Sequence, residues 1–253
     1  MGFQKLNYLQ HKQLLIDITK GVSKKILLKK YNIGDTTFYE MKKRMPDKEV
    51  KSKDFEVRVD FFRKINSEEK AYWLGFIAAD GCVYNNVLEV ASNIKDTKHI
   101  AKLFRKSLNS SQDTPYHDKK QNTIKYRLCR KEICDDLATH GIIPRKTFKL
   151  EFPTTVPKKY LHHFIRGYFD GDGSVTFNKN RNCYRYMFYG NLSFLSELAK
   201  YIKYTNRIYN SGTIYVIDKN SKKDCGRFFK YLYKNASIFL ERKRDKFLEI
   251  MNL

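Results

Sequence analysis

The chain has 253 residues, of which 50 are Lys or Arg and 27 are Asp or Glu, so its formal net charge is +23. Aromatic residues make up 15% of the sequence, which excludes a disordered basic tail, and no stretch approaches the ~18 apolar residues of a membrane span. A polyanionic partner, most commonly nucleic acid, is the simplest explanation of this charge, and a well-solvated basic surface is the alternative.

The start of the chain and its cysteines indicate a protein that is not secreted. No apolar signal-peptide core follows Met1, so we expect a cytoplasmic location, or an organellar one if the gene belongs to an organelle. The 5 cysteines are odd in number and form no Cys-x-x-Cys pair. We therefore expect them to be reduced, with neither zinc nor disulfide bonds.

Residues 1–60 are predicted to form a small all-helical module followed by a charged linker. Apolar residues at helical spacing predict helices over residues 8–18 and 24–31. A tight turn and a polar third helix follow, and Pro46 prevents that helix from continuing.

The short helix, turn and polar helix in residues 24–44 (KKILLKKYNIGDTTFYEMKKR) resemble the helix-turn-helix modules of resolvases and many repressors. In such a module the third helix enters the major groove of DNA. The alternative is a small helical bundle that serves packing only. The resemblance makes four residues of the third helix candidates for DNA contacts: Thr36, Thr37, Lys42 and Lys43.

An apolar segment, YWLGFIAADG at residues 72–81, opens the next part of the chain, 61–153. Ser67 and two following Glu residues predict that its helix begins there. Behind it we expect a hairpin over 82–92, an amphipathic helix over 97–108, a strand over 123–130 and a helix over 131–140.

The strand over 123–130 alternates strictly, so Lys125 and Arg127 lie on the face opposite Ile124 and Leu128. A strand with one apolar and one cationic face is what a saddle on DNA needs. A solvated sheet face is the alternative.

A second apolar segment, FIRGYFDGDG at residues 164–173, repeats the pattern of the first in the part of the chain from 154 to 253. It is followed in the same order by a predicted hairpin over 174–189, a helix over 192–204, a hairpin over 207–217 and a helix over 225–232. Basic residues in and around these hairpins are further candidates for DNA contacts: Arg181, Arg185 and Arg207.

Each of the two apolar segments has small residues four positions apart, Gly75 with Ala79 and Gly167 with Gly171, so each helix has one smooth face. Two such faces can pack at unusually close range. Each segment ends in Asp-Gly, where Gly suits the left-handed residue that closes a helix. Packing would bring Asp80 and Asp172 together at one end, and a cation would have to compensate the two like charges.

The two segments resemble the two motifs of a double-motif, single-chain LAGLIDADG homing endonuclease, and RGYFDGDGSV is an especially close match. The first copy departs from the motif at Ala78, where an earlier acidic residue usually stands. The resemblance covers about residues 65 to 250. It implies an α+β fold in which two pseudo-symmetric αββαββα halves, 61–153 and 154–253, form a β-saddle over DNA.

The resemblance also implies a site-specific DNA endonuclease that makes a metal-dependent double-strand break at a long asymmetric target. Asp80 and Asp172 would hold the metal, Mg²⁺ with Mn²⁺ as a substitute, together with the main chain at Ala79 and Gly171. Lys146 and Lys243, which follow the two motifs at matching positions, correspond to the basic residue beside the scissile phosphate and would join the two acids in catalysis. A surface cation is the alternative for either lysine.

Other polar residues near the motifs are given smaller roles. Asp170 is expected at the helix end and not on the metal, and His162 and His163 are expected to pack or cap within the second motif helix. Ser92 and Asn191 fall near a position that arranges water in related enzymes.

The internal repeat predicts a monomer with pseudo-two-fold symmetry that binds double-stranded DNA. The alternative is a non-catalytic nucleic-acid binder on the same scaffold, either an intron maturase with intron RNA as its partner or a transcription regulator. The two Asp-Gly ends favour the enzyme, because a binder has no use for paired acids that face phosphate.

Overall fold

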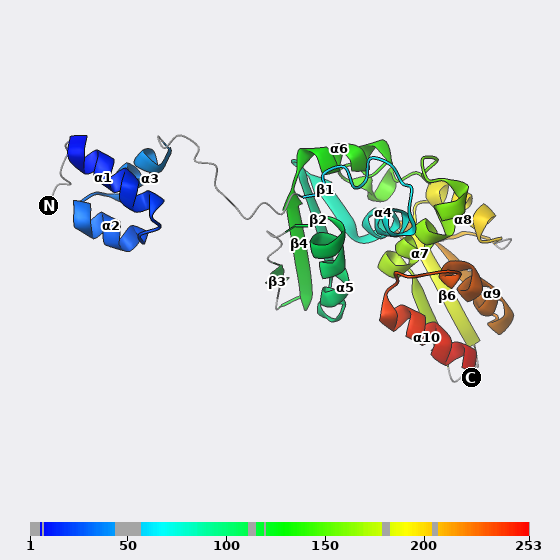
Figure 1. The fold of residues 1–253 in the computed structure, drawn as a ribbon. Coiled ribbons are helices and arrows are strands. Elements are labelled where there is room, and N and C mark those ends of the chain that lie inside the picture. Colours follow the sequence, from blue (N-terminus) through cyan, green and yellow to red (C-terminus); the bar gives the residue numbers. More distant parts are fainter. Residues whose placement is uncertain are drawn as a thin grey trace. The chain divides into compact units, whose positions relative to one another are not determined.

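The computed structural model describes residues 6, 8–43, 57–110, 115–118, 120–178, 183–203 and 207–252 (Figure 1). The chain divides into two compact units, residues 1–54 and 55–253. Among the described residues, no helix is both long and apolar enough to span a membrane.

The first unit contains three short helices, α1 (Tyr8–Thr19), α2 (Lys24–Tyr31) and α3 (Asp35–Lys43). Asn32 ends α2 in the left-handed conformation, with φ 49°, and so makes the turn before α3. The predicted end of the third helix at Pro46 and the predicted linker lie largely outside the described residues. Five apolar side chains form the core of this unit: Leu14, Leu27, Tyr31, Ile33 and Phe38.

A buried carboxylate joins two helices of the first unit. Asp17 on α1 accepts hydrogen bonds from the Tyr31 hydroxyl (2.7 Å) and the Lys30 ammonium (2.6 Å) on α2. These donors, Lys30 first, lower the pKa of Asp17 to about 2. The ionised carboxylate therefore fixes α1 on α2 at neutral pH.

The second unit repeats one order of elements twice. The first half contains α4 (Glu68–Asp80), β1 (Gly81–Tyr84), β2 (Val87–Asn93), α5 (Thr97–Ala101), β3 (Tyr116–Asp118), β4 (Thr123–Cys129) and α6 (Lys131–Thr139). The second half contains α7 (Leu161–Asp172), β5 (Ser174–Asn178), β6 (Cys183–Gly190), α8 (Leu192–Tyr201), β7 (Tyr209–Ser211), β8 (Ile214–Lys219) and α9 (Lys222–Tyr233). The predicted mixed fold of two αββαββα halves is confirmed.

Each half has one four-stranded antiparallel sheet, with strand orders β1-β2-β4-β3 and β5-β6-β8-β7. Helices α5 and α6 pack on the first sheet, and α8 and α9 pack on the second. On β4, Ile124 and Leu128 are buried while Arg127 is exposed, in agreement with the predicted alternation. The helices and the apolar strand residues thus share one face, and the basic residues lie on the other.

Two predicted elements differ from the structure, and one observed helix was not predicted. The helix predicted over 97–108 is α-helical only to Ala101 and continues as a π-helix over Lys102–Ser107. The helix predicted to end at residue 204 ends at Tyr201. A last helix, α10 (Glu241–Asn252), was not predicted, because its sequence is dominated by charged residues, although Phe247 anchors it in the core.

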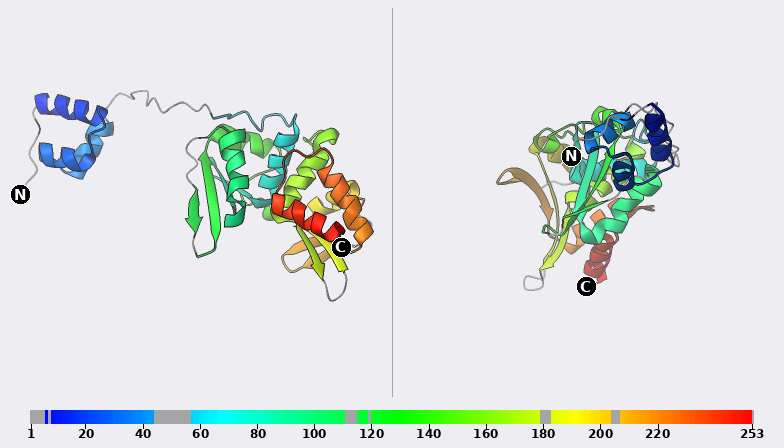
Figure 2. Two further views of the ribbon diagram at one scale, coloured as in Figure 1. Left: turned by 60° about the horizontal axis from the view of Figure 1, so that its bottom comes forward. Right: turned by 90° about the vertical axis from the view of Figure 1, so that its left-hand side faces the viewer.

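The two motif helices α4 and α7 lie side by side between the sheets (Figures 1 and 2). Ser67 caps the start of α4, as predicted, by accepting a hydrogen bond from the Lys70 N–H (3.3 Å). The small residues permit a backbone-to-backbone approach: a Cβ on Gly167 would lie 1.9 Å from the Tyr72 carbonyl oxygen, and one on Gly75 would lie 2.0 Å from that of Phe164. The predicted close packing is confirmed.

The glycines after the motif acids are required for a different reason from the one predicted. Gly81 and Gly173 are extended, with φ −81° and −73°, so the prediction of a left-handed helix end is wrong. A Cβ on Gly81 would lie 2.6 Å from the Ile77 carbonyl oxygen, and one on Gly173 would lie 2.6 Å from that of Phe169. Each chain folds back onto the last turn of its own helix, and only a residue without a side chain fits there.

Polar side chains cross the interface between the two motif helices. Arg166 on α7 is fully buried and pairs with Glu68 on α4 (2.6 Å). Tyr72 on α4 donates a hydrogen bond to Asp170 on α7 (2.8 Å). Trp73, also fully buried, packs edge-on against the ring of Tyr72, with 5.1 Å between the centroids. The halves are therefore joined by buried charge and by apolar contact.

Candidate active site

The close crossing of α4 and α7 brings their carboxyl-terminal ends together. Asp80 is the last residue of α4 and Asp172 is the last residue of α7. Asp80 is partly buried at this end, and Asp172 beside it has more of its surface exposed to solvent. The structure therefore brings together the two acids that the sequence predicted to meet.

The environment of these acids disfavours two negative charges. Burial, followed by the negative charge of Asp172, raises the pKa of Asp80 to about 7. Burial also raises the pKa of Asp172, and the charges of Lys146 and Lys243 oppose that rise. A divalent cation would relieve the repulsion between the carboxylates more completely than the lysines do.

The two candidate lysines lie beside the acids. The Lys146 ammonium donates a hydrogen bond to the Ala79 carbonyl (3.0 Å). The Lys243 ammonium donates to the carbonyls of Phe169 (2.7 Å), Gly171 (3.0 Å) and Gly173 (2.6 Å). Burial lowers the pKa of both lysines, that of Lys243 to about 8.

The donor set fits a hard divalent ion. Two carboxylates meet at the site, and the carbonyls of Ala79 and Gly171, the predicted main-chain ligands, lie next to them in sequence. The described residues contain no group of three or more His, Cys, Asp or Glu side chains that could hold a metal. Mg²⁺ takes few protein oxygens and completes its coordination with water and phosphate, so a site with two acids suits it better than it suits a structural metal.

A small cavity of about 230 Å³ opens at this place. Asp172, Ala79 and Lys146 line it together with Tyr168 and Tyr189. The Tyr168 hydroxyl donates a hydrogen bond to the Tyr189 carbonyl (2.8 Å), which fixes the wall of the cavity against β6. Asp172 and Lys146 thus face open space that a ligand can reach.

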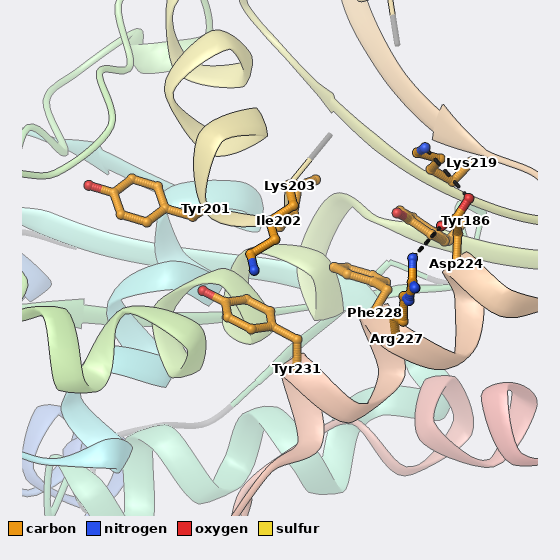
Figure 3. Close-up of a pocket in the computed structure, with 9 residues that line it drawn as sticks. All are labelled: Tyr186, Tyr201, Ile202, Lys203, Lys219, Asp224, Arg227, Phe228 and Tyr231. Carbon is orange, nitrogen blue, oxygen red and sulfur yellow. Dashed lines mark ion pairs between the residues drawn. The ribbon is translucent and has the colours of Figure 1, made fainter. Parts of the chain in front are cut away.

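A larger cavity, of about 570 Å³, lies in the second half, lined by residues of α8, α9, β6 and β8 (Figure 3). Tyr186 and Phe228 stack in its wall, with 4.2 Å between their centroids. Asp224 forms ion pairs there with Lys219 (3.5 Å) and Arg227 (4.0 Å). Neither motif aspartate lines this cavity, so the chemistry is assigned to the smaller one.

Several residues near the motifs serve the fold. Asp170 is fully buried, where burial raises its pKa to about 6, and it accepts a hydrogen bond from the Leu240 N–H (2.7 Å). His163 lies 2.8 Å from the Arg166 guanidinium. Asn191 caps α8 by accepting from the Phe194 N–H (2.9 Å). Asn191 thus caps the start of α8. Its position in the sequence had suggested a role in arranging water.

Ser92, the other residue weighed for arranging water, donates a weak hydrogen bond (3.4 Å) to Asp96. Asp96 also accepts hydrogen bonds from the Arg242 guanidinium, the two shortest at 2.9 and 2.8 Å. This ion pair joins the first half to the start of α10 beside Lys243. The sequence contained no signal for it, because the partners are far apart along the chain and α10 was not predicted.

Two of the strand arginines predicted to contact DNA form ion pairs within the protein. Arg127 forms an ion pair with Glu89 on β2. Arg185 forms one with Asp218 on β8 (2.6 Å). Lys125 is partly exposed and Arg207 is exposed.

The structure describes only some of the remaining candidates for DNA contacts. Thr36 is exposed and Thr37 is partly buried on α3. Lys42 and Lys43 belong to α3, and only their backbone is described. Arg181 lies outside the described residues.

Comparison with known proteins agrees with this fold. The family model of the LAGLIDADG-like domain matches residues 159–233. A structure of the LAGLIDADG meganuclease I-CpaMI bound to uncleaved DNA superposes with a TM-score of 0.50 at 13% identity, covering 72% of this chain and 90% of that one. A lysine-to-alanine mutant of I-SmaMI superposes with a TM-score of 0.50 at 10% identity, covering 74% and 91%.

A search of curated proteins gave no match. The matched domain contains the second motif, and the fold match extends over both halves. Residues 159–233 therefore match a LAGLIDADG-like domain, and the chain has the fold of the LAGLIDADG meganucleases.

Proposed function

We propose that this protein is a site-specific DNA endonuclease that makes a metal-dependent double-strand break at a long asymmetric target. The observation that carries the proposal is the meeting of Asp80 and Asp172 at the crossing of α4 and α7, with a lysine beside each end. The net charge of +23 supports a polyanionic substrate. The I-CpaMI structure, which shares the fold, is one of a meganuclease bound to DNA.

The motif acids and the two lysines would have different roles in hydrolysis. Asp80 and Asp172, with the carbonyls of Ala79 and Gly171, would hold Mg²⁺, for which Mn²⁺ would substitute. A bound ion of this kind supplies an activated water and a Lewis acid for the phosphate. Lys146 and Lys243 would place positive charge beside the motif ends, close to where negative charge builds up during phosphodiester cleavage.

The exposed faces of the two sheets would form the DNA-binding saddle, with residues 61–153 reading one half-site and 154–253 the other. Different side chains stand on equivalent strands, so the half-sites need not match. The ion pairs of Arg127 with Glu89 and of Arg185 with Asp218 hold the guanidinium groups in place and can be exchanged for phosphate or base contacts. Lys125, Arg181 and Arg207 would add further contacts. A protein that cuts DNA would work where a genome is present, in the cytoplasm or in an organelle.

The test is cleavage of DNA that the protein itself selects. Duplexes retained from a randomised library are sequenced, resynthesised and incubated with the protein and Mg²⁺, Mn²⁺ or EDTA. We expect a double-strand break at one position with either ion and none with EDTA. Tight, selective binding without cleavage under any metal condition would overturn the proposal in favour of a non-catalytic binder, such as a maturase or a transcription regulator.

We expect one protein molecule to bind one duplex, because both halves of the pseudo-symmetric unit come from one chain. Sedimentation velocity of the protein mixed with the selected duplex measures the stoichiometry. A complex of two proteins per duplex would contradict this prediction. The free protein is expected to sediment as a monomer at the same concentration.

The N-terminal module, assigned to residues 1–60 with its linker, is expected to add affinity and site length without taking part in cleavage. It contributes no acid to the motif ends, and its third helix would supply Thr36, Thr37, Lys42 and Lys43 to DNA. Removing residues 1–50 should shorten the DNase I footprint and raise the dissociation constant about 10-fold or more, as expected when a tethered second binding site is lost. The cleavage rate at saturating protein should stay within about 2-fold of that of the full chain.

The control for the truncation is its fold, measured by circular dichroism. If the shortened protein is folded and its footprint is unchanged, the module does not contact DNA.

A further inference from the structure

The two lysines of the candidate active site are held very differently. All three ammonium hydrogens of Lys243 are donated to carbonyls at the end of α7, and the residue is only 6% exposed. Lys146 is more exposed, and among the described residues its ammonium makes a single hydrogen bond, to the Ala79 carbonyl. Lys146 therefore has two donors left for a ligand, whereas Lys243 must break an internal bond to release one.

The residue before each lysine shows the same difference. Arg242 is fixed by its hydrogen bonds to Asp96, a carboxylate that is only 3% exposed. Its counterpart Arg145 is exposed and stands in the left-handed conformation, with φ 57°. In the part of the chain that the structure describes, no side chain pairs with Arg145. Arg242 is therefore held by a buried carboxylate, whereas Arg145 is not.

The motif itself explains part of the difference. Asp170 in the second copy accepts the Leu240 N–H at 2.7 Å and so fastens the segment that leads to Lys243. The equivalent position in the first copy is Ala78, whose methyl group cannot accept a hydrogen bond. The segment that leads to Lys146 therefore lacks this attachment to its own motif helix.

We propose that the two lysines have different tasks: Lys146 contacts the scissile phosphate of one strand, whereas Lys243 is a positioning residue that fixes the end of α7 and with it Asp172. This inference rests on the endonuclease function proposed above. Replacing Lys146 removes a contact to the reacting phosphate and leaves the fold intact. Replacing Lys243 leaves three carbonyls without a donor and loosens a helix end that both half-sites share.

The experiment compares full-length Lys146→Met, Lys243→Met and the two Lys→Arg variants with the wild type. Melting temperatures of the free proteins are measured by circular dichroism. Strand-resolved single-turnover rates are measured with Mg²⁺ on the selected duplex, which carries a different fluorophore on each 5′ end. The temperature is one at which every variant is folded.

For Lys146→Met we expect an unchanged melting temperature and a loss of at least about 100-fold in the rate for one strand only, so that nicked DNA accumulates. Lys146→Arg should recover part of that rate, because arginine keeps the charge and the donors. For Lys243→Met we expect a melting temperature lower by about 5 °C or more and an equal slowing of both strands. Lys243→Arg should not recover either property, because a planar guanidinium does not fit among three carbonyls.

Three results would overturn the inference. One is a Lys243→Met protein with a wild-type melting temperature in which a single strand is slowed, which would make Lys243 a phosphate contact. Another is a Lys243→Met protein of lower melting temperature that cuts both strands at the wild-type rate, which would limit the residue to stability. The third is a Lys146→Met protein in which neither strand is slowed.

A milder variant keeps the test decisive if Lys243→Met is recovered only as aggregate. Asp96→Asn releases Arg242 and should lower the melting temperature and slow both strands equally, and no change in either would overturn the inference. If the wild type cuts no selected duplex, the endonuclease proposal fails. The melting temperatures still decide whether Lys243, unlike Lys146, holds the helix end.

Discussion

Asp80→Asn and Asp172→Asn are each expected to slow double-strand cleavage by at least about 1,000-fold, because the loss of one carboxylate removes several kcal/mol of metal-assisted stabilisation. Asparagine keeps the size of the side chain at each helix end, where the two acids meet. It removes the negative charge that would hold a divalent ion. DNA binding should be unchanged or tighter, because a carboxylate that faces phosphate is repelled by it.

Thermal unfolding distinguishes a catalytic loss from a structural one. The pKa of Asp80 is raised to about 7 in the folded protein, above its ordinary value of 3.8, so folding favours the protonated form. The free energy of unfolding therefore rises as the pH falls from about 7 towards 4. At pH 7 the ionised carboxylate of Asp80 destabilises the folded protein. We expect Asp80→Asn to melt at or above the wild-type temperature at pH 7.

The measurement is single-turnover cleavage and binding affinity for the selected duplex, with Asp135→Asn as the matched control. Asp135 is an exposed acid on α6 that pairs with Lys131 (2.5 Å), far along the chain from either motif end. The control should cut and bind as the wild type does. Parallel loss of binding, cleavage and melting temperature in the motif variants would mean that the acids hold the helix ends and not a metal.

Gly167→Ala is expected to destabilise the second unit by more than about 3 kcal/mol or to prevent its folding. The added methyl group would clash with main-chain atoms, which cannot move aside as a flexible side chain can. The added Cβ would lie 1.9 Å from the Tyr72 carbonyl oxygen and 2.9 Å from the Phe76 nitrogen, both main-chain atoms of α4. The helices would have to separate, which would also part Asp80 from Asp172. Chemical denaturation of the full-length protein measures the loss.

The matched control for this variant is Gly212→Asn. Gly212 occupies a hairpin turn with φ 78°, and an added Cβ would meet no atom within 4 Å. Asparagine tolerates the left-handed conformation, so the loss should stay below about 1 kcal/mol. A Gly167→Ala protein as stable as this control would show that the motif helices do not require their close approach.

The order of elements and the meeting of the two acids could be predicted because both depend on local spacing. Gly75 and Gly167 mark the smooth helix faces in the sequence itself, and one motif copied twice predicts a pseudo-dimer. The reason for Gly81 and Gly173 could not be predicted in this way. An Asp-Gly at a helix end fits both a left-handed closure and a tight return of the chain, and only the backbone path distinguishes them.

Side-chain pairs between the halves escaped prediction for a related reason. Glu68 and Arg166 lie on different motif helices, and their pairing depends on how those helices cross. Asp96 and Arg242 depend in addition on α10, in whose charged sequence the buried Phe247 does not stand out. Such contacts are set by tertiary packing, and periodicity along the chain does not reveal them.

The burial of Trp73 has a practical consequence for measuring the stabilities of the two units separately. It is the single tryptophan of the sequence and lies fully buried on α4, where its ring contacts those of Phe76 and His99. The first unit contributes no indole, so intrinsic tryptophan fluorescence follows the unfolding of the second unit alone. Far-ultraviolet ellipticity follows the helices of both units. A difference between the two unfolding curves of one sample would therefore give the separate stability of the N-terminal module without any label or truncation.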